Sequence, residues 1–301
     1  MFFIFKYDYG IIGGDIRQTL LLQELEKEYA CISYDIKKID KKIFLSDRDE
    51  KEIQSQTIEE MVYQSENLLF PIPFLREGKL NLSKENKINL QDLEEMLYPG
   101  QKIYGGKIPL EFRERIEKKG MTCFDYMEEE SIATYNSIAT AEGVIAEILQ
   151  SFPYNLHGAA VLVLGYGRCA KTLVNKLQAM KAKVTVYARR KEAGMEAYTQ
   201  GADCIGKEEL LKEIEKFPVI INTIPQRIFK KNELEIFPLP IYLYEIASSP
   251  YCADPKEAKE VGINFYVCSG LPGKYSPISS AMILKKYLLE KRKEEKKNEI
   301  K

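Results

Sequence analysis

Three small residues near the middle of the chain have the spacing of a phosphate-binding turn. In the stretch VLVLGYGRCAKTL, Gly165, Gly167 and Ala170 match the dinucleotide fingerprint G-x-G-x-x-G/A. The first glycine permits a tight turn, the second lets a pyrophosphate approach the backbone, and the small third residue lets the next helix pack closely. The pyrophosphate would rest on that helix's N-terminus, where N–H groups and the dipole favour an anion. We predict a dinucleotide site formed by Gly165, Tyr166, Gly167, Arg168 and Cys169; an ordinary glycine turn is the alternative.

Two arginines indicate which dinucleotide this turn would hold. NAD-binding proteins usually place an acid about 20 residues after the glycines, where it binds the ribose 2′-hydroxyl. Here the second strand ends in VYARRK, with Tyr187 and Ala188 in the acid's place and Arg189 and Arg190 after them. A guanidinium binds a 2′-phosphate that a carboxylate would repel. The pattern favours NADP over NAD, with a solvated pair of surface arginines as the alternative.

A polar stripe marks an otherwise apolar helix pattern before the glycine turn. In TYNSIATAEG, Asn136 and Thr140 are four residues apart and share one helix face, and Ser137 lies three residues from Thr140. These side chains could bind substrate or the nicotinamide amide. Hydrogen bonding between helices is an equally good interpretation of the same stripe.

The elements around the glycine turn predict a parallel sheet. Short β-branched or aromatic runs alternate with helix patterns throughout the second half of the chain. Such alternation is typical of a parallel sheet covered by helices on both faces. The strands are expected within residues 159–165, 183–188, 218–225, 241–247 and 264–270, and the helices within residues 169–182, 207–217 and 254–262.

The first half of the chain predicts a second, less regular α/β domain. Residues 9–29 read as strand, glycine turn and helix, and further strands are expected within 30–36 and 65–74. A helix is expected within 109–120. Long helix patterns follow at about 128–150 and after residue 276.

The predicted fold class is α/β, with two Rossmann-like domains that each hold a parallel sheet. An N-terminal α/β substrate domain is expected at 1–127, a connecting helix at 128–150 and an NADP-binding Rossmann domain at 151–275. Residues 276–301 are predicted to form a C-terminal helix that returns to the N-terminal domain and ends in a charged tail. This plan predicts a cleft between the domains.

Composition and charge exclude several classes of protein. The 301 residues are 45% hydrophobic and 30% charged, which is typical of a globular protein. Lys and Arg total 44 against 45 for Asp and Glu, so net charge gives no reason to expect nucleic acid or an acidic membrane as partner. No apolar run approaches the roughly 20 residues that span a bilayer. Six scattered cysteines without a CxxC pair suggest reduced thiols, no metal site and a cytoplasmic location.

Several short stretches, taken together and in order, resemble those of one protein family, the A subunit of dipicolinate synthase. This family is found in endospore-forming bacteria. The resemblance covers nearly the whole chain. The stretches that carry it are IIGGDIRQ (11–18), TYNSIATAEG (134–143), LGYGRCA (164–170), INTIP (221–225), EIASSP (245–250) and SGLPGKYSP (269–277). The chain departs from the family's usual pattern after ASSP, where it has YCAD at 251–254, and after GLPGK, where it has YSPISSA.

The resemblance implies an activity and partners. The family is associated with oxidising the cyclic product of dihydrodipicolinate synthesis to pyridine-2,6-dicarboxylate with NADP, in the mother cell during sporulation. The smaller, flavoprotein-like B subunit of dipicolinate synthase is the expected partner, and a homo-oligomer is left open. Two other functions remain as alternatives: another amino-acid, imino-acid or 2-hydroxyacid dehydrogenase, or a cofactor-binding subunit without catalysis of its own. Residue patterns do not separate the last alternative from the first.

The resemblance also implies further site residues. Because the substrate would be a dianion, Arg17 in the first glycine turn is the predicted carboxylate ligand, with a surface arginine as the alternative; Asp15 is expected to be a helix N-cap. In dehydrogenases of this plan the loop after the fourth strand passes the nicotinamide ribose. The predicted cofactor residues in these later loops are Asn222, Thr223, Ile224, Pro225, Ala247, Gly270, Leu271 and Pro272.

The only histidine argues against one neighbouring enzyme class. His157 precedes the strand that enters the glycine turn, so it is expected at the wrong end of the sheet for catalysis. A histidine-based hydroxyacid dehydrogenase mechanism would then lack its base. Aromatisation needs little acid–base help, because loss of water and hydride yields a stable ring.

Overall fold

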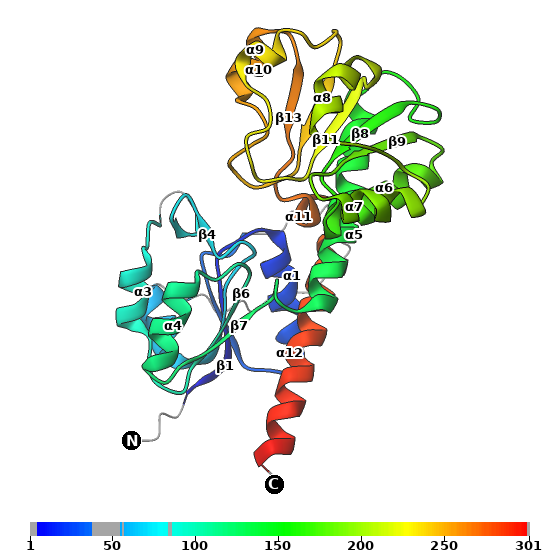
Figure 1. Ribbon diagram of the computed structural model, residues 1–301. Helices are drawn as coiled ribbons and strands as arrows, with labels where there is room; N and C mark the ends of the chain where they lie inside the picture. The colour runs from blue at the N-terminus through cyan, green and yellow to red at the C-terminus, as the bar shows by residue number, and fades with distance from the viewer. Residues whose placement is uncertain (1–4, 38–54, 56, 84–85, 300–301) are drawn as a thin grey trace. The chain divides into compact units, whose positions relative to one another are not determined.

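The computed structural model describes residues 5–37, 55, 57–83 and 86–299. The chain forms two compact units, and each is considered by itself (Figure 1). Unit 1 comprises Met1–Tyr135 and Pro277–Lys301, drawn in blue to green and in red, and unit 2 comprises Asn136–Ser276. Unit 1 is therefore built from two segments that are distant in sequence, whereas unit 2 is one continuous segment.

Unit 2 holds a parallel sheet of six strands in the order β10-β9-β8-β11-β12-β13. This is the Rossmann order 3-2-1-4-5-6, in which the order of strands reverses beside the first strand and leaves a crevice at the carboxyl edge. The strands are β8 (Ala160–Leu164), β9 (Lys183–Tyr187), β10 (Asp203–Ile205), β11 (Val219–Asn222), β12 (Tyr242–Glu245) and β13 (Asn264–Val267).

The strands of unit 2 are apolar on both faces because helices cover both sides. In β8, Val161 and Val163 pack into one core and Leu162 and Leu164 into the other, and all four are fully buried. Helices α5, α6 and α7 contribute to the first core, and α8, α9 and α10 to the second. The helices are α5 (Glu130–Ser151), α6 (Arg168–Ala179), α7 (Lys191–Thr199), α8 (Lys207–Glu213), a 3-10 turn (Ile214–Lys216), α9 (Lys231–Leu234), α10 (Pro255–Glu260) and α11 (Leu271–Tyr275).

Unit 1 holds a second parallel sheet, of five strands in the order β2-β1-β3-β6-β7. This is the other common doubly wound order, 2-1-3-4-5. Its strands are β1 (Tyr7–Ile12), β2 (Cys31–Tyr34), β3 (Ser65–Leu69), β6 (Lys102–Gly105) and β7 (Thr122–Asp125), and a small antiparallel hairpin pairs β4 (Leu75–Arg76) with β5 (Lys79–Leu80).

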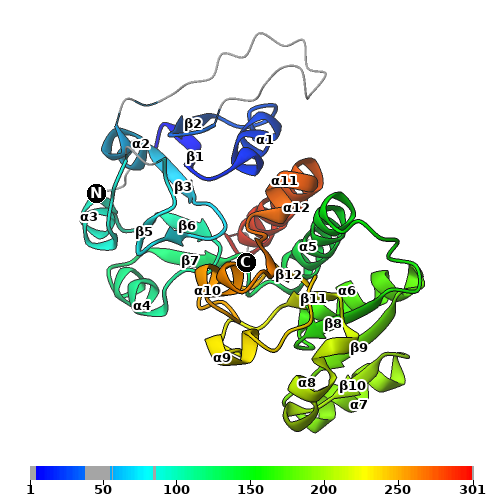
Figure 2. The same ribbon diagram turned by 90° about the horizontal axis from the view of Figure 1, so that it is seen from above.

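The helices of unit 1 also divide between the two faces of its sheet. One core contains residues of α2, α3 and α4, and the other contains residues of α1 and α12 (Figure 2). The first six residues of α5, 130–135, belong to this unit, and Ile132 packs into the second core. The helices are α1 (Ile16–Leu25), α2 (Ile58–Gln64), α3 (Leu90–Met96), α4 (Leu110–Lys118) and α12 (Pro277–Glu299).

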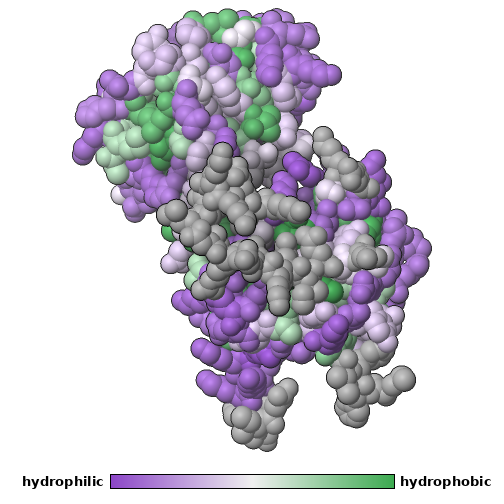
Figure 3. All heavy atoms as spheres, turned by 180° about the vertical axis from the view of Figure 1, so that it is seen from behind, coloured by the Kyte–Doolittle hydropathy of each residue, from purple (hydrophilic) through white to green (hydrophobic). Residues whose placement is uncertain are grey.

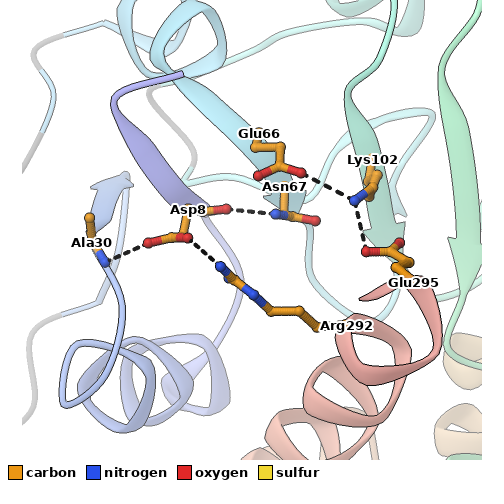
Figure 4. A network of polar contacts seen from close by, with 7 residues as sticks. All are labelled: Asp8, Ala30, Glu66, Asn67, Lys102, Arg292 and Glu295. Carbon is orange, nitrogen blue, oxygen red and sulfur yellow. Dashed lines mark hydrogen bonds and ion pairs between the residues drawn. The ribbon is translucent and has the colours of Figure 1, made fainter. Parts of the chain in front are cut away.

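Charged side chains of α12 form ion pairs and hydrogen bonds with the sheet of unit 1. Arg292 of α12 donates from Nη2 to Asp8 Oδ1 at 2.8 Å, and its guanidinium lies over the Tyr29 ring, 4.6 Å from the ring centroid. Lys102 Nζ is 3.1 Å from Glu66 Oε1 and 2.8 Å from Glu295 Oε2 (Figure 4). These contacts join α12 directly to the amino ends of β1 and β6, and through Lys102 to the amino end of β3.

The predicted fold class is confirmed, since both units hold parallel, doubly wound sheets. Several elements were not predicted, and those absent from the sequence expectations are α2, α3, α7, α9, α11, β4, β5, β6, β7 and β10. Strands β6 and β7 are short, and each follows a polar or glycine-containing stretch that weakens the strand pattern. The helix expected at about 128–150 is α5, and the one expected after residue 276 is α12.

The surface shown in Figure 3 is mostly hydrophilic, with smaller hydrophobic areas on both units. Scattered apolar side chains of this kind are normal on folded proteins.

None of the helices in the described part of the chain combines the length and the hydropathy of a membrane-spanning segment.

Candidate dinucleotide-binding site

The glycine turn lies at the carboxyl end of β8, in the middle of the unit 2 sheet. Gly165 has φ +100°, a backbone conformation that side chains disfavour. A Cβ at this position would also lie 2.5 Å from Thr223 Oγ1 and 2.8 Å from Ile224 Cγ1. Glycine is needed here for two reasons, the turn itself and the close approach of the loop after β11.

The second glycine and the third small residue have different surroundings. Gly167 is the N-cap of α6, and a Cβ built on it would meet nothing within 4 Å. Because glycine has no side chain to accept from the first-turn N–H groups, those groups can serve an anion. Ala170 is fully buried and packs in the core between α6 and the sheet. The turn has the open space and the helix N-terminus that a pyrophosphate requires.

Tyr166 turns inward rather than toward that open space. It is 7% exposed and packs in the core with Ala170, while Lys171 Nζ lies 5.6 Å from its ring centroid. A ligand would therefore meet the backbone at Tyr166 rather than its ring.

The loop after β11 is held against the glycine turn by its own short bonds. Thr223 donates from N and Oγ1 to the Leu164 carbonyl, at 3.0 and 2.8 Å. Asn222 is fully buried, and its Oδ1 accepts from the Ile224 N–H at 3.0 Å. The side chain of Asn222 therefore shapes the loop from inside, whereas Thr223 and Ile224 are half-buried and Pro225 is exposed.

Sequence reasoning missed Glu245, which ends β12 and is 1% exposed. Asn222 Nδ2 lies 2.8 and 2.9 Å from its two carboxylate oxygens, and the N–H groups of Ala247 and Cys252 donate to it at 2.9 and 2.8 Å. Burial raises the pKa of the Glu245 carboxyl, and these donors oppose the rise. One signal was available, because a single acid closes the otherwise apolar run IYLYE.

The two arginines expected to select NADP follow β9 and are both exposed. Arg189 Nη1 donates to Gln226 Oε1 at 2.7 Å, which links the turn after β9 to the loop after β11. Arg190 is the N-cap of α7. Gln226 is a second residue that sequence reasoning did not single out.

The last loop of unit 2 begins with Gly270, which has φ +66° and is the N-cap of α11. Leu271 and Pro272 are buried in the first turn of that helix. A Cβ on Gly143 of α5 would lie 2.8 Å from Leu271 Cβ, so a glycine here lets the two helices meet. These bonds and contacts place the loop after β13 at the sheet's carboxyl edge, against α5.

The polar stripe on α5 includes one bond between helices. Ser137 Oγ lies 2.9 Å from Thr172 Oγ1 of α6, whereas Thr140 Oγ1 donates to the Asn136 carbonyl at 2.7 Å, within its own helix. Asn136 and Thr140 are half-buried. Part of the stripe is therefore used for packing, and the role of Asn136 and Thr140 toward a ligand stays a prediction.

In unit 1, Arg17 lies in the first turn of α1 and is 6% exposed. Asp15 is the N-cap, as expected, and accepts from the Arg17 N–H at 3.0 Å. The Arg17 guanidinium donates from Nε and Nη2 to the Asp15 carboxylate, and from Nη2 to the Ile72 carbonyl at 2.8 Å. Because these bonds use Nε and both Nη2 hydrogens, a substrate carboxylate would bind through Nη1 or displace Asp15.

His157 is exposed and lies just before β8, at the amino edge of the unit 2 sheet. That is the edge opposite the glycine turn. Among the residues that the structure describes, no group of three or more His, Cys, Asp or Glu could hold a metal ion.

Comparisons with known proteins find similar sequences and structures among the A subunits of dipicolinate synthase. The model for the N-terminal domain of the dipicolinate synthase A subunit matches residues 8–127. The curated A subunit of dipicolinate synthase from Bacillus subtilis (strain 168) is 28% identical over 285 residues, covering 91% of this chain and 92% of the relative. A crystal structure of the same subunit from Bacillus halodurans superposes with a TM-score of 0.79 at 27% identity, covering 96% of this chain and 99% of that one. The crystal structure from Bacillus subtilis gives a TM-score of 0.76 at 25% identity, covering 97% and 98%. Over nearly its whole length the chain is therefore similar to dipicolinate synthase A subunits, and residues 8–127 match the model for the N-terminal domain of that family.

Proposed function

We propose that this chain is an NADP-dependent oxidoreductase subunit that makes dipicolinate. The reaction is oxidation of the cyclic dihydrodipicolinate-pathway intermediate to pyridine-2,6-dicarboxylate during sporulation. The observation that carries the proposal is the open glycine turn at Gly167, set at the reversal point of a Rossmann sheet in a chain similar to dipicolinate synthase A subunits.

The cofactor preference rests on Arg189 and Arg190. Tyr187 and Ala188 stand where NAD-binding proteins usually carry an acid, so no carboxylate is present there to bind a ribose 2′-hydroxyl or to repel a 2′-phosphate. The Arg189 guanidinium is already oriented by Gln226, at the end of the strand next to the glycine turn. A preoriented guanidinium suits a 2′-phosphate, because planar fork geometry matches phosphate oxygens.

The cofactor supplies the hydride acceptor, and the protein has to bind and orient the reactants. In this proposal the α6 N-terminus binds the pyrophosphate, and the loops at 222–225 and 270–272 border the nicotinamide half. Ala247, in the loop after β12, is proposed to lie at the same carboxyl edge of the unit 2 sheet. The ring product forms when the substrate loses water, a hydride to NADP and a proton to solvent.

The substrate and the partner follow from the family name and the resemblance. A dicarboxylate substrate would need a cation, and Arg17 is our candidate through its Nη1. The flavoprotein-like B subunit of dipicolinate synthase is the proposed partner. The proposed place of action is the cytoplasm of the mother cell.

The test uses the chain with and without its partner. Freshly generated dihydrodipicolinate-pathway product and NADP are added, and absorbance of NADPH and of the pyridine ring is followed together. Coupled appearance of both signals supports the proposal. Ring formation without NADPH, or no nucleotide binding at all, contradicts it.

A second candidate is a subunit that binds NADP and positions its partner without catalysis. The observation that favours it is the engagement of Arg17 with Asp15 and Ile72, which leaves little of the guanidinium for a substrate. In the same assay, NADP binding without turnover under any condition would support this role.

A further inference from the structure

We propose that Glu245 is a positioning residue for the dinucleotide. Its carboxylate joins the loops after β11 and β12 and holds them against the glycine turn. This inference rests on the proposed cofactor site of unit 2, and it assigns a role to a residue that contacts the site only through other residues.

The first argument is the set of groups around the carboxylate. Asn222 comes from β11, whereas Ala247 and Cys252 lie in the loop after β12. One side chain therefore fixes two loops at the edge where dinucleotides bind in this fold.

The second argument is that these bonds reach the glycine turn within two steps. Glu245 orients Asn222 Nδ2, and the other end of that amide accepts from the Ile224 N–H at 3.0 Å. Ile224 and its neighbour Thr223 are the residues that a Cβ on Gly165 would strike. A shift of the Asn222 side chain would thus move the wall of the pyrophosphate turn.

The third argument is the free-energy cost of burying the Glu245 carboxylate. Each recorded partner of the Glu245 carboxylate, among the described residues, is an uncharged donor, so the buried charge is not balanced by a cation. Replacing buried ionic groups by apolar residues is often neutral or stabilising, so stability alone does not explain such a charge. A donor-only environment does require an acceptor on both oxygens, and a carboxylate is the side chain that provides it.

The need for a hydrogen-bond acceptor at both oxygens of residue 245 determines which variants test the proposal. Glu245→Gln keeps the shape but turns one acceptor into an amide that points its hydrogens at Asn222 or at a loop N–H. Glu245→Asp keeps both acceptors and the charge but withdraws them by one methylene. If Glu245 positions the loops, NADPH affinity should fall in the order wild type, Glu245→Asp, Glu245→Gln.

Unit 1 offers a matched control. Asp125 ends β7 and is 8% exposed, and its carboxylate accepts from the N–H groups of Lys107, Ile108 and Met127 at 3.0, 2.7 and 2.8 Å. Asp125→Asn removes a buried loop-fixing carboxylate of the same kind from the unit without the glycine fingerprint. It should leave the NADPH dissociation constant within about twofold of wild type.

The measurement is a calorimetric titration of full-length protein with NADPH, which yields both the dissociation constant and the fraction of competent protein. Glu245→Gln should raise the dissociation constant at least about 10-fold in the protein that still binds. A merely structural residue would lower the competent fraction and leave the dissociation constant unchanged, and that result would overturn the inference. So would an unchanged constant in a fully competent variant.

A second readout separates this inference from the proposed function. If wild type binds no nicotinamide nucleotide, the proposed function fails, and amide hydrogen exchange then decides the role of Glu245. Exchange at Ile224, Ala247 and Cys252 should accelerate together in Glu245→Gln, because all three amides depend on one carboxylate. Unchanged exchange at Ile224 would show that the two loops are not coupled.

Discussion

Arg189 and Gln226 meet across the carboxyl edge of the unit 2 sheet, with Nη1 and Oε1 2.7 Å apart. Arg189 follows β9 and Gln226 lies in the loop after β11, and β8 runs between these two strands. The bond therefore spans the strand that leads into the glycine turn. It fixes a guanidinium beside the proposed phosphate site before any ligand binds.

Arg189→Ala should weaken NADP binding by roughly 10- to 100-fold and leave NAD binding unchanged, because a phosphate loses a charge-assisted fork. Titration of both cofactors against wild type and variant measures this. Arg227→Ala is the control, since Arg227 is an exposed arginine of the same unit whose guanidinium lies 3.8 Å from Asp254. Equal affinity of wild type for NAD and NADP would rule out the preference.

Gln226→Ala should have a smaller effect of the same kind. Without its amide partner, the Arg189 side chain must be ordered when the cofactor binds, which costs about 0.5–1.5 kcal/mol or roughly 2- to 12-fold in NADP affinity. NAD affinity should not change. A Gln226→Ala variant that loses NAD and NADP affinity equally would show that the loop itself had been disturbed instead.

Alanine substitutions at the two glycines of the turn should have different effects. Gly165→Ala forces a Cβ into Thr223 and Ile224 at a φ of +100°, so the ligand-free protein should lose stability by about 1–3 kcal/mol. Gly167→Ala meets nothing within 4 Å and should fold normally, yet its Cβ would stand where a pyrophosphate approaches. Thermal unfolding and NADPH titration together distinguish the two. Undiminished NADPH binding by Gly167→Ala would argue against the pyrophosphate site.

Arg17→Ala should lower kcat/KM for the dicarboxylate by about 100-fold or more and leave the NADPH dissociation constant nearly unchanged, because only the substrate loses a charged partner. The variant also breaks the ion pair with Asp15, so a control is needed. Asp15→Asn removes the charge of that pair but keeps the guanidinium and an N-cap oxygen. Equal losses in kcat/KM for the two variants would assign Arg17 to local structure rather than to substrate.

The stability of unit 1 should depend on pH through Glu24 in the last turn of α1, which forms ion pairs with Lys27 and with Lys285 of α12. The Lys27 ammonium, which donates a hydrogen bond, lowers the pKa of Glu24 below its ordinary value of 4.5; burial opposes this, and Lys285 of α12 lowers it further. A lowered carboxyl pKa contributes stability that is present above pH 4.5 and is lost as the pH falls through the folded-state pKa. Glu24→Gln should therefore cost up to about 1 kcal/mol at pH 7 and nothing well below pH 4. Urea unfolding at both pH values measures the difference, and a pH-independent cost would exclude this mechanism.

The glycine turn could be predicted from sequence because its requirements are local. Gly165, Gly167 and Ala170 each answer a backbone or packing need that lies within a few residues, and the flanking strand and helix patterns are strong. The parallel sheets could also be predicted, because strands covered on both faces show continuous apolar runs such as AVLVL. The two strand orders, by contrast, depend on pairings between distant segments.

Glu245 and Gln226 could not be predicted for the same reason. Their partners, Asn222 and Arg189, lie 23 and 37 residues away in sequence, and only the folded sheet brings the loops together. For Arg17, the sequence predicts a cation at a helix start that binds a substrate carboxylate, with a surface arginine as the alternative. The structure shows that Asp15, two residues earlier, and the distant Ile72 carbonyl take up most of its donors. Local patterns identify the residue type, but only tertiary contacts identify what it binds.

The two-segment construction of unit 1 has a consequence for biosynthesis. Unit 2 is continuous from Asn136 to Ser276, so its core can close while α12 is still inside the ribosome. One core of unit 1 instead needs Ala281, Leu284 and Leu288 beside residues of α1, across more than 250 positions of chain. The N-terminal segment of unit 1 is therefore synthesised first, but its core is completed last. The apolar side chains that pack against α12 stay exposed while the whole of unit 2 is translated. That interval is when the nascent chain would most need a chaperone.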